Sequence, residues 1–311
     1  MHLAGLILNY QIMTKTKFID LSHDFGFKIV FANPDYPELL MRFLNEIIPD
    51  REIVSITYLN PEVLGPDEDG KRYVYDIKCT DENGNVFIVE MQKKSYNYFG
   101  DRLLAYSGIP LSQILKKGET YDAARLLYVV SVLGESLIVN DEDKEFRKSL
   151  VRRASVTMSD SGKVLSDKLN FIFLQLSAAR SPMRADSFLE KFAWYIRTMS
   201  TYDEVPDEEQ NDYFKRLFEA SDRNNISEDK LSIYDRMVRD EIQIKAELDF
   251  AVEQAEAKGL AKGLAEGEAT GLAKGKAEEK LAIAKAMKEK GVDIDIILQT
   301  TGLPEEQIKT L

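Results

Sequence analysis

The pattern of apolar and polar positions predicts a mixed α/β region in the first part of the chain. Apolar residues 27–31 lie in a short helical stretch that stops before Asn33-Pro34, since proline disfavours helix at the residue before it. Residues 36–48 have the three- and four-residue apolar spacing of a second helix. Runs rich in β-branched or aromatic residues predict three strands, over residues 53–59, 71–80 and 86–92.

The same region continues with one helix and one strand. Residues 97–117 have helical spacing, and we expect this helix to bend or break near Gly108 and Pro110, because proline removes a backbone donor. Residues 125–133 are almost continuously apolar, which is typical of a central strand covered on both faces. We therefore predict an α/β domain over residues 1–133.

Residues 134–250 are predicted to form a mixed, mainly helical extension. A hairpin is expected around Asp160-Ser161-Gly162, followed by an apolar strand over residues 168–176. Helical patterns then continue to about Phe250.

Residues 251–279 are predicted to form a helical stalk with a tetrapeptide repeat of Gly, Ala, Lys and Glu. Glycine recurs every fourth residue from Gly259 to Gly275, with alanine two places after each. Four residues turn by about 400° on a helix, so the glycine stripe drifts by about 40° per repeat and does not match the heptad of a left-handed coiled coil. Small residues do permit close helix approach, so a homo-oligomer through this repeat is the alternative to a stalk without chemistry, which we favour.

Residues 280–311 are predicted to form three short helices in a helix-turn-helix-like unit. The helix that would read DNA begins at Pro304 and carries Glu305 and Glu306 in its first turn. Two acids at that position favour a capping or assembly role over DNA reading.

Composition and charge narrow the classes of function. The 311 residues include 41 Lys and Arg against 53 Asp and Glu, a net charge of −12, which argues against a polybasic coat for nucleic acids or anionic membranes. An enzyme that handles a polyanion through metal ions is not excluded, because carboxylates then become the working groups. One cysteine, Cys79, and two histidines exclude a disulfide framework and an ordinary structural zinc site.

Targeting signals are not evident in the sequence. No apolar run approaches about 18 residues, so we expect no membrane span and a cytoplasmic protein. Residues 1–12 are apolar but lack the basic start and the cleavage site of a signal peptide, and Met13 opens a polar run. We therefore expect translation to begin at Met13.

Two carboxylates in the predicted strands carry the candidate chemistry. Asp76 is expected mid-strand, and Glu90 lies between Val89 and Met91 near the end of the next strand. Aspartate is disfavoured inside strands, and a buried carboxylate is costly unless something compensates its charge.

The turn between these strands decides whether the two carboxylates meet. A two-residue Asn83-Gly84 loop pairs residues whose numbers sum to 167, which puts Asp76 and Glu90 on opposite faces. A three-residue loop over residues 82–84 gives a sum of 166 and puts them directly opposite on one face. In the second register the carboxylates would repel each other unless a divalent metal ion bridges them.

These residues resemble a known family. An aspartate, a turn, and then Glu-x-Gln over residues 90–92 resemble the PD-(D/E)XK nuclease core, whose last position is usually lysine. Residues 20–28 (DLSHDFGFK), residues 89–106 and the C-terminal repeat resemble, more narrowly, the PD-(D/E)XK nuclease family transposases, or recombination-promoting nucleases. The resemblance covers nearly the whole chain and implies a restriction-endonuclease-like core, a mixed sheet flanked by helices, within residues 1–133.

The resemblance also implies a metal site. Asp76, Glu90 and the backbone carbonyl of Met91 would hold Mg²⁺ or Mn²⁺, ions that accept carboxylates and keep several waters. Gln92 takes the catalytic position of the lysine, where it can orient a water but cannot carry charge or act as a base. Asp24 is either a further metal ligand or the cap of the first helix.

DNA contacts are expected around this site. Residues 92–117 hold five Lys or Arg and one Asp, so the stretch after Glu90 is locally basic. The DNA-binding candidates are Lys28, Lys93, Lys94, Tyr98, Arg102 and Tyr106. The sequence thus favours an Mg²⁺-dependent DNA endonuclease associated with recombination or mobile elements. The alternative is a non-catalytic DNA-binding or assembly protein whose nuclease site has decayed at Gln92.

Overall fold

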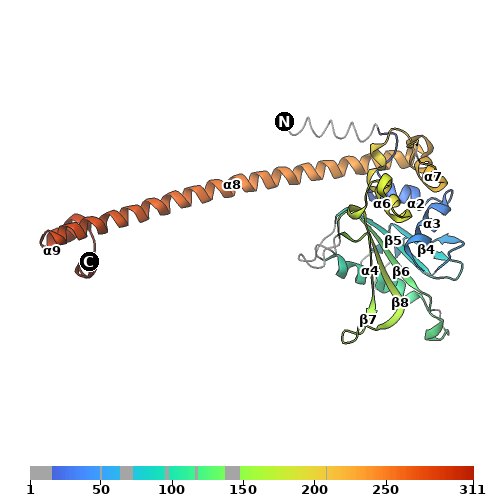
Figure 1. Cartoon of the computed structure of the whole chain (residues 1–311), viewed down its shortest axis with the longest axis horizontal. Helices are drawn as coiled ribbons and strands as arrows, with labels where there is room; N and C mark the ends of the chain where they lie inside the picture. The colour runs from blue at the N-terminus through green and yellow to red at the C-terminus, as the bar shows by residue number, and fades with distance from the viewer. Residues whose placement is uncertain are drawn as a thin grey trace. The chain divides into compact units, whose positions relative to one another are not determined.

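The computed structural model describes residues 16–49, 51–63, 73–94, 98–115, 118–136, 148–207 and 209–311 (Figure 1). The expected translation start at Met13 and the basic residues Lys116 and Lys117 lie outside these ranges. The chain divides into two compact units, Met1–Ile242 and Gln243–Leu311.

A mixed six-stranded sheet organises the first unit, in the order β1-β4-β5-β6-β8-β7. The strands are β1 (Ile56–Tyr58), β4 (Ile77–Asp81), β5 (Val86–Gln92), β6 (Leu127–Leu133), β7 (Val151–Thr157) and β8 (Val164–Gln175). The β5–β6 and β6–β8 pairs are parallel, and the other pairs are antiparallel. A separate two-stranded sheet pairs β2 (Glu62–Val63) with β3 (Tyr73–Val74). The central position of β6 agrees with its apolar sequence, because all seven of its residues are buried.

The expected extension contributes to this same sheet. The predicted hairpin forms between β7 and β8 and turns at Gly162, whose φ is +65°. β8 pairs in parallel with β6, so strands from both sides of residue 133 form one sheet. The sequence pattern had suggested a domain boundary at this residue.

Helices cover both faces of the sheet (Figure 1). One core cluster joins α2 (Asp24–Phe31), α3 (Pro37–Ile47), α6 (Phe188–Thr198) and α7 (Asp212–Ser221) to one face of the sheet. The other face carries α4 (Phe99–Gln113), whose Phe99 and Leu103 pack with Ile88 of β5. Short 3₁₀ helices span η1 (Tyr121–Ala123), η2 (Leu176–Ala178), η3 (Pro182–Arg184), η4 (Met199–Thr201) and η5 (Arg223–Asn225). This arrangement agrees with a restriction-endonuclease-like fold.

Of the bend or break expected in α4, the break is wrong, because the helix continues through both Gly108 and Pro110. Pro110 cannot donate to the carbonyl of Tyr106 one turn earlier. That carbonyl instead accepts a hydrogen bond from the Tyr75 hydroxyl at 2.8 Å, so the acceptor that proline leaves open is satisfied from the sheet.

The second unit is helical. Helix α8 (Glu228–Glu289) begins in the first unit, where Tyr234 and Val238 are core residues, and includes the whole glycine repeat. Helices α9 (Ile294–Thr301) and α10 (Glu305–Thr310) follow, and Ala284, Ile297 and Ile308 form a small core with α8. Of the three helices predicted over residues 280–311, the second and third form as α9 and α10, whereas the first is the end of the long helix α8. Within the described ranges, no helix has the length and apolar character needed to span a bilayer.

Candidate functional site

The β4–β5 hairpin has the register that brings the two carboxylates together. Gly84 adopts φ +77° in the turn, and its N–H donates to the Asp81 carbonyl at 3.1 Å. Ile77 pairs with Val89, so the residue numbers sum to 166 and Asp76 falls opposite Glu90. The pairing predicted for a three-residue loop over residues 82–84 is confirmed.

Asp76 lies just before β4 and not in the middle of a strand, which corrects the sequence expectation. The break between β3 and β4 frees its side chain from the ladder. One carboxylate oxygen, Oδ2, accepts a hydrogen bond from the backbone N–H of Met91 at 2.7 Å. An aspartate is tolerated here because it satisfies a backbone donor near the end of β5.

Glu90 is buried in β5, with the residue only 4% exposed, and its Oε1 has no hydrogen-bond partner in the described part of the chain. Ser131 of β6 is in register with Glu90 on the parallel neighbouring strand. It is fully buried, and its Oγ also has no partner among the described residues. Both side chains share the sheet face of Ile88 and Val129, on which α4 packs. Buried polar atoms are normally satisfied, so two neighbouring unsatisfied oxygens indicate a site that takes a further group.

Ser131 is absent from the residues predicted from the sequence. It is the one polar residue in the apolar strand LYVVSVL, and that exception was the available signal.

Burial controls the electrostatics of the carboxylate pair. It raises the pKa of Asp76 to about 7, against the opposing hydrogen bond from Met91. Burial also raises the pKa of Glu90 to about 8, and the negative charge of Asp76 adds to the shift. Arg102 lowers both pKa values, and Lys28 lowers that of Asp76. Without a bound cation, the pair therefore retains protons near neutral pH.

Gln92 and Arg102 border the pair from β5 and α4. Gln92 donates from Nε2 to the Met91 carbonyl at 2.9 Å. Arg102 donates from Nη1 to Gln92 Oε1 at 3.3 Å, and its guanidinium lies 4.9 Å from the Tyr106 ring centroid. Tyr106 in turn packs edge-on against Tyr75, whereas Tyr98 is 59% exposed at the start of α4. The structure thus brings Gln92 and Arg102 to the carboxylates.

Helix α2 contributes Asp24 and Lys28, one turn apart. His23 caps this helix, because its Nδ1 accepts from the Phe25 N–H at 3.2 Å. The alternative in which Asp24 caps the helix is therefore wrong, because Asp24 is the first helical residue. Partial desolvation raises the pKa of Asp24, although its side chain still reaches solvent, and its charge raises the pKa values of Asp76 and Glu90.

Lys93, expected to contact DNA, forms ion pairs with two carboxylates. Its Nζ lies 3.2 Å from Glu241 of α8 and 3.9 Å from Asp20. The same glutamate lies 3.6 Å from His23 Nε2. Lys93 therefore links the end of the β5 motif to the first part of α8, while Lys94 is exposed.

The donor atoms fit a hard divalent ion that keeps part of its water shell. No group of three or more His, Cys, Asp or Glu side chains suited to a metal occurs within the described ranges. Two facing carboxylates, one with an unpartnered buried oxygen, leave the remaining positions to waters and neutral oxygens such as the Met91 carbonyl. Mg²⁺ commonly binds proteins in this way, through one or two carboxylates.

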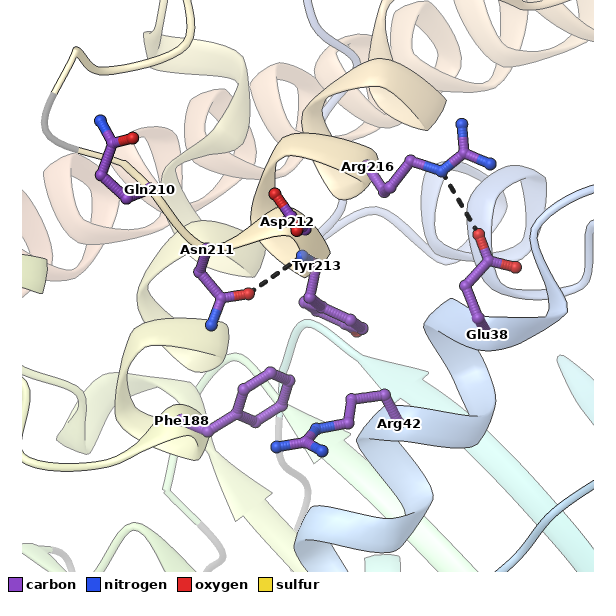
Figure 2. A pocket seen from close by; sticks show the side chains of 8 residues that line it. All are labelled: Glu38, Arg42, Phe188, Gln210, Asn211, Asp212, Tyr213 and Arg216. Carbon is purple, nitrogen blue, oxygen red and sulfur yellow. Dashed lines mark hydrogen bonds and ion pairs between the residues drawn. The ribbon is translucent and has the colours of Figure 1, made fainter.

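A separate open pocket of about 630 Å³ lies among α3, α6 and α7, and none of the candidate site residues lines it (Figure 2). Its arginines are already paired: Arg216 with Glu38 at 3.5 Å and Glu219 at 2.9 Å, and Arg42 with Glu46. The Arg216–Glu38 pair connects α7 to α3 and the other two lie within one helix, so we assign the pocket no chemistry.

Comparisons with known proteins give two family matches. The model of the PD-(D/E)XK nuclease family transposases matches residues 21–251, three quarters of the chain. The model of the Rpn/YhgA-like nuclease family C-terminal helix-turn-helix domain matches residues 277–311. No curated protein and no solved structure matches the chain.

Proposed function

Because the chain belongs to the PD-(D/E)XK nuclease family transposases, we propose that it is a divalent-metal-dependent DNA endonuclease acting on mobile elements or in recombination. The helix-turn-helix match is consistent with DNA as the partner. The observation that carries the proposal is the facing pair of Asp76 and Glu90, with a buried glutamate oxygen that lacks a partner.

Asp76 and Glu90, with the Met91 carbonyl, would hold Mg²⁺ or Mn²⁺. Asp24, which is exposed to solvent, is a candidate for a further metal ligand. When bound, such an ion lowers the pKa of a coordinated water and offsets negative charge on the phosphate. Gln92 would hydrogen-bond and orient the attacking water, since its amide cannot accept a proton as a base. Lys28, Lys94 and Arg102 would contact phosphate oxygens, with Lys93 anchoring the end of the motif and Tyr98 and Tyr106 flanking the DNA.

The test is nicking of supercoiled plasmid by the full-length protein in Mg²⁺ or Mn²⁺, with EDTA as a blank. Asp76→Asn and Glu90→Gln keep the size and one acceptor oxygen but remove the charge, and each should reduce nicking by at least about 100-fold. Asp160→Asn, at the exposed β7–β8 turn, is the matched control and should retain wild-type activity. Equal nicking by the wild type and both site variants would exclude the enzyme.

A second candidate function is DNA binding or assembly without cleavage, and the observation that favours it is Gln92 in the lysine position. It predicts that the wild type binds a labelled duplex but leaves plasmid intact with either metal. Asp76→Asn would then leave the duplex affinity unchanged, as measured by fluorescence anisotropy.

A further inference from the structure

Residue 92 is uncharged, although the last position of the PD-(D/E)XK motif is usually lysine. Gln92 offers an amide, which hydrogen-bonds but carries no charge. Cleavage of a phosphodiester builds negative charge on the phosphate, and a fixed cation beside that charge stabilises the transition state. A nuclease with this sequence needs the charge from another element.

We propose that Arg102 of α4 supplies the positive charge that position 92 lacks, an inference that rests on the proposed nuclease function. Its Nη1 donates to Gln92 Oε1 at 3.3 Å, so the guanidinium lies next to the side chain that replaces lysine. Gln92 connects the arginine to the site, because its own Nε2 is bonded to the Met91 carbonyl at 2.9 Å.

The environment of Arg102 holds the guanidinium in place. It lies 4.9 Å from the Tyr106 ring centroid, one turn along the helix, where cation–π attraction favours it. Tyr106 is fixed in turn by Tyr75, whose ring packs edge-on against it and whose hydroxyl bonds to the Tyr106 carbonyl. These contacts orient the arginine before DNA arrives.

The other nearby cations fit this role less well. Lys28 influences Asp76 from α2 but forms no hydrogen bond with Gln92 in the described part of the chain. Lys93 is ion-paired with Glu241 and Asp20. Arg102 is the cation that acts on both Asp76 and Glu90 as well as contacting Gln92.

Arg102 would act as a fixed charge and not as a base, since a guanidinium does not deprotonate in proteins. Its N–H groups would donate to a non-bridging oxygen of the scissile phosphate, while Gln92 holds the attacking water. The charge and the water-orienting contact, which one lysine can combine, are then divided between two side chains.

The experiment exchanges the charge between the two positions in the full-length protein. Arg102→Gln should reduce plasmid nicking by about 100-fold, the loss typical of one transition-state donor. Adding Gln92→Lys to Arg102→Gln should raise nicking at least about 10-fold above that of Arg102→Gln alone, because a positive charge returns at the neighbouring position. Lys28→Gln is the matched control: it removes a nearby cation, and Gln92→Lys should not rescue it.

Binding of Mn²⁺ alone, measured by calorimetry, separates this role from a structural one. At a pH where both carboxylates are ionised, Arg102→Gln should bind Mn²⁺ at least as tightly as the wild type, because a positive charge that repels the metal ion has been removed. Parallel loss of metal binding and nicking would mean that Arg102 maintains structure, and would overturn the inference.

The outcomes distinguish this inference from the proposed function. The proposed role of Arg102 would be contradicted if Asp76→Asn abolishes nicking while Arg102→Gln does not, or if Gln92→Lys fails to rescue Arg102→Gln. In either case the proposed nuclease function would remain supported. If the wild type nicks plasmid with neither metal, both the nuclease function and the role of Arg102 would be contradicted.

Discussion

The protonation of two facing carboxylates couples the site to the stability of the fold. The pKa of Asp76 is raised to about 7 and that of Glu90 to about 8, whereas in the unfolded chain both groups titrate near pH 4. Between these values the metal-free folded protein binds more protons than the unfolded chain. Its free energy of unfolding therefore decreases as pH rises from about 4 to about 8.

Asp76→Asn should remove part of this pH dependence. Asparagine keeps an oxygen that can accept from the Met91 N–H but does not ionise. We expect the variant to match the wild type at pH 5 and to exceed its unfolding free energy at pH 9 by on the order of 2 kcal/mol. Urea unfolding in EDTA at both pH values measures this, with Asp160→Asn as control. Equal stability of variant and wild type at pH 9 would contradict the expectation.

Ser131 should matter for metal binding more than for folding. Its hydroxyl is buried without a described partner beside Glu90, so removing it leaves no donor unsatisfied and should change stability by less than about 1 kcal/mol. Ionised Glu90, however, needs a donor when it holds a metal, and loss of such a supporting group typically weakens binding by about 10-fold. We expect Ser131→Ala to show both effects by thermal unfolding and Mn²⁺ calorimetry. Exposed Ser155→Ala of β7 is the control, and unchanged Mn²⁺ affinity in Ser131→Ala would refute the role.

At the scale of elements, local patterns predicted most helices and strands, and turn chemistry reduced the β4–β5 pairing to two possible registers. The structure selects the three-residue loop, with Gly84 at positive φ, and this loop places Asp76 opposite Glu90. The expectations that failed depend on contacts between distant residues. In α4, the carbonyl that Pro110 leaves without a donor accepts from the Tyr75 hydroxyl, a contact with a distant residue. The importance of Ser131 depends on the parallel pairing of β5 with β6, which no local pattern reveals.

The sheet topology and the cap of α2 are two further features that the local sequence pattern did not predict. The addition of β7 and β8 to the sheet is a long-range pairing, so a sequence boundary at residue 133 could not anticipate it. His23 caps α2 in place of Asp24 through its ring nitrogen, a less common use of histidine than aspartate capping. For the site, the residue types predicted the carboxylate pair, but the residues around these carboxylates could be identified only from the folded structure.

The glycines of α8 allow a direct test of the stalk. A side chain built at Gly259, Gly263, Gly267, Gly271 or Gly275 meets nothing within 4 Å. Replacing all five by alanine should raise helix stability by up to about 1 kcal/mol per site without a clash. We expect higher helicity and a higher melting temperature by circular dichroism, with unchanged mass by light scattering. A fall from dimer to monomer mass would instead show that copies pack through the glycine stripe.

At the scale of the whole molecule, the net charge of −12 restricts where DNA can bind. The basic stretch over residues 92–117 follows Glu90, although Lys93 is ion-paired there. Lys28 of α2 and Arg102 of α4 both lower the pKa of Asp76, so these two cations act on the carboxylate site. We therefore expect phosphate contacts to cluster at this site and binding elsewhere to be weak.

The C-terminal unit should contribute little to DNA affinity, although it matches a helix-turn-helix family. Residues 277–311 hold five lysines against seven Asp or Glu, and α10 begins with Glu305 and Glu306. Two of its lysines are engaged internally: Lys288 bonds to the carbonyls of Ile308 and Lys309, and Lys309 pairs with Glu305 at 2.6 Å.

Neutralising Glu305 and Glu306 tests whether α10 approaches DNA. If it did, the double variant Glu305→Gln, Glu306→Gln would remove two repulsive charges, release Lys309 and steepen the dependence of affinity on salt by about one phosphate contact. We expect less than about a 2-fold change in affinity and an unchanged salt slope, measured by anisotropy on a labelled duplex in EDTA. Arg102→Gln in the same assay should flatten the slope, because its phosphate contact is lost. Tighter binding and a steeper slope in the double variant would instead place α10 against the DNA backbone, and the role of the C-terminal unit would then be DNA recognition and not assembly.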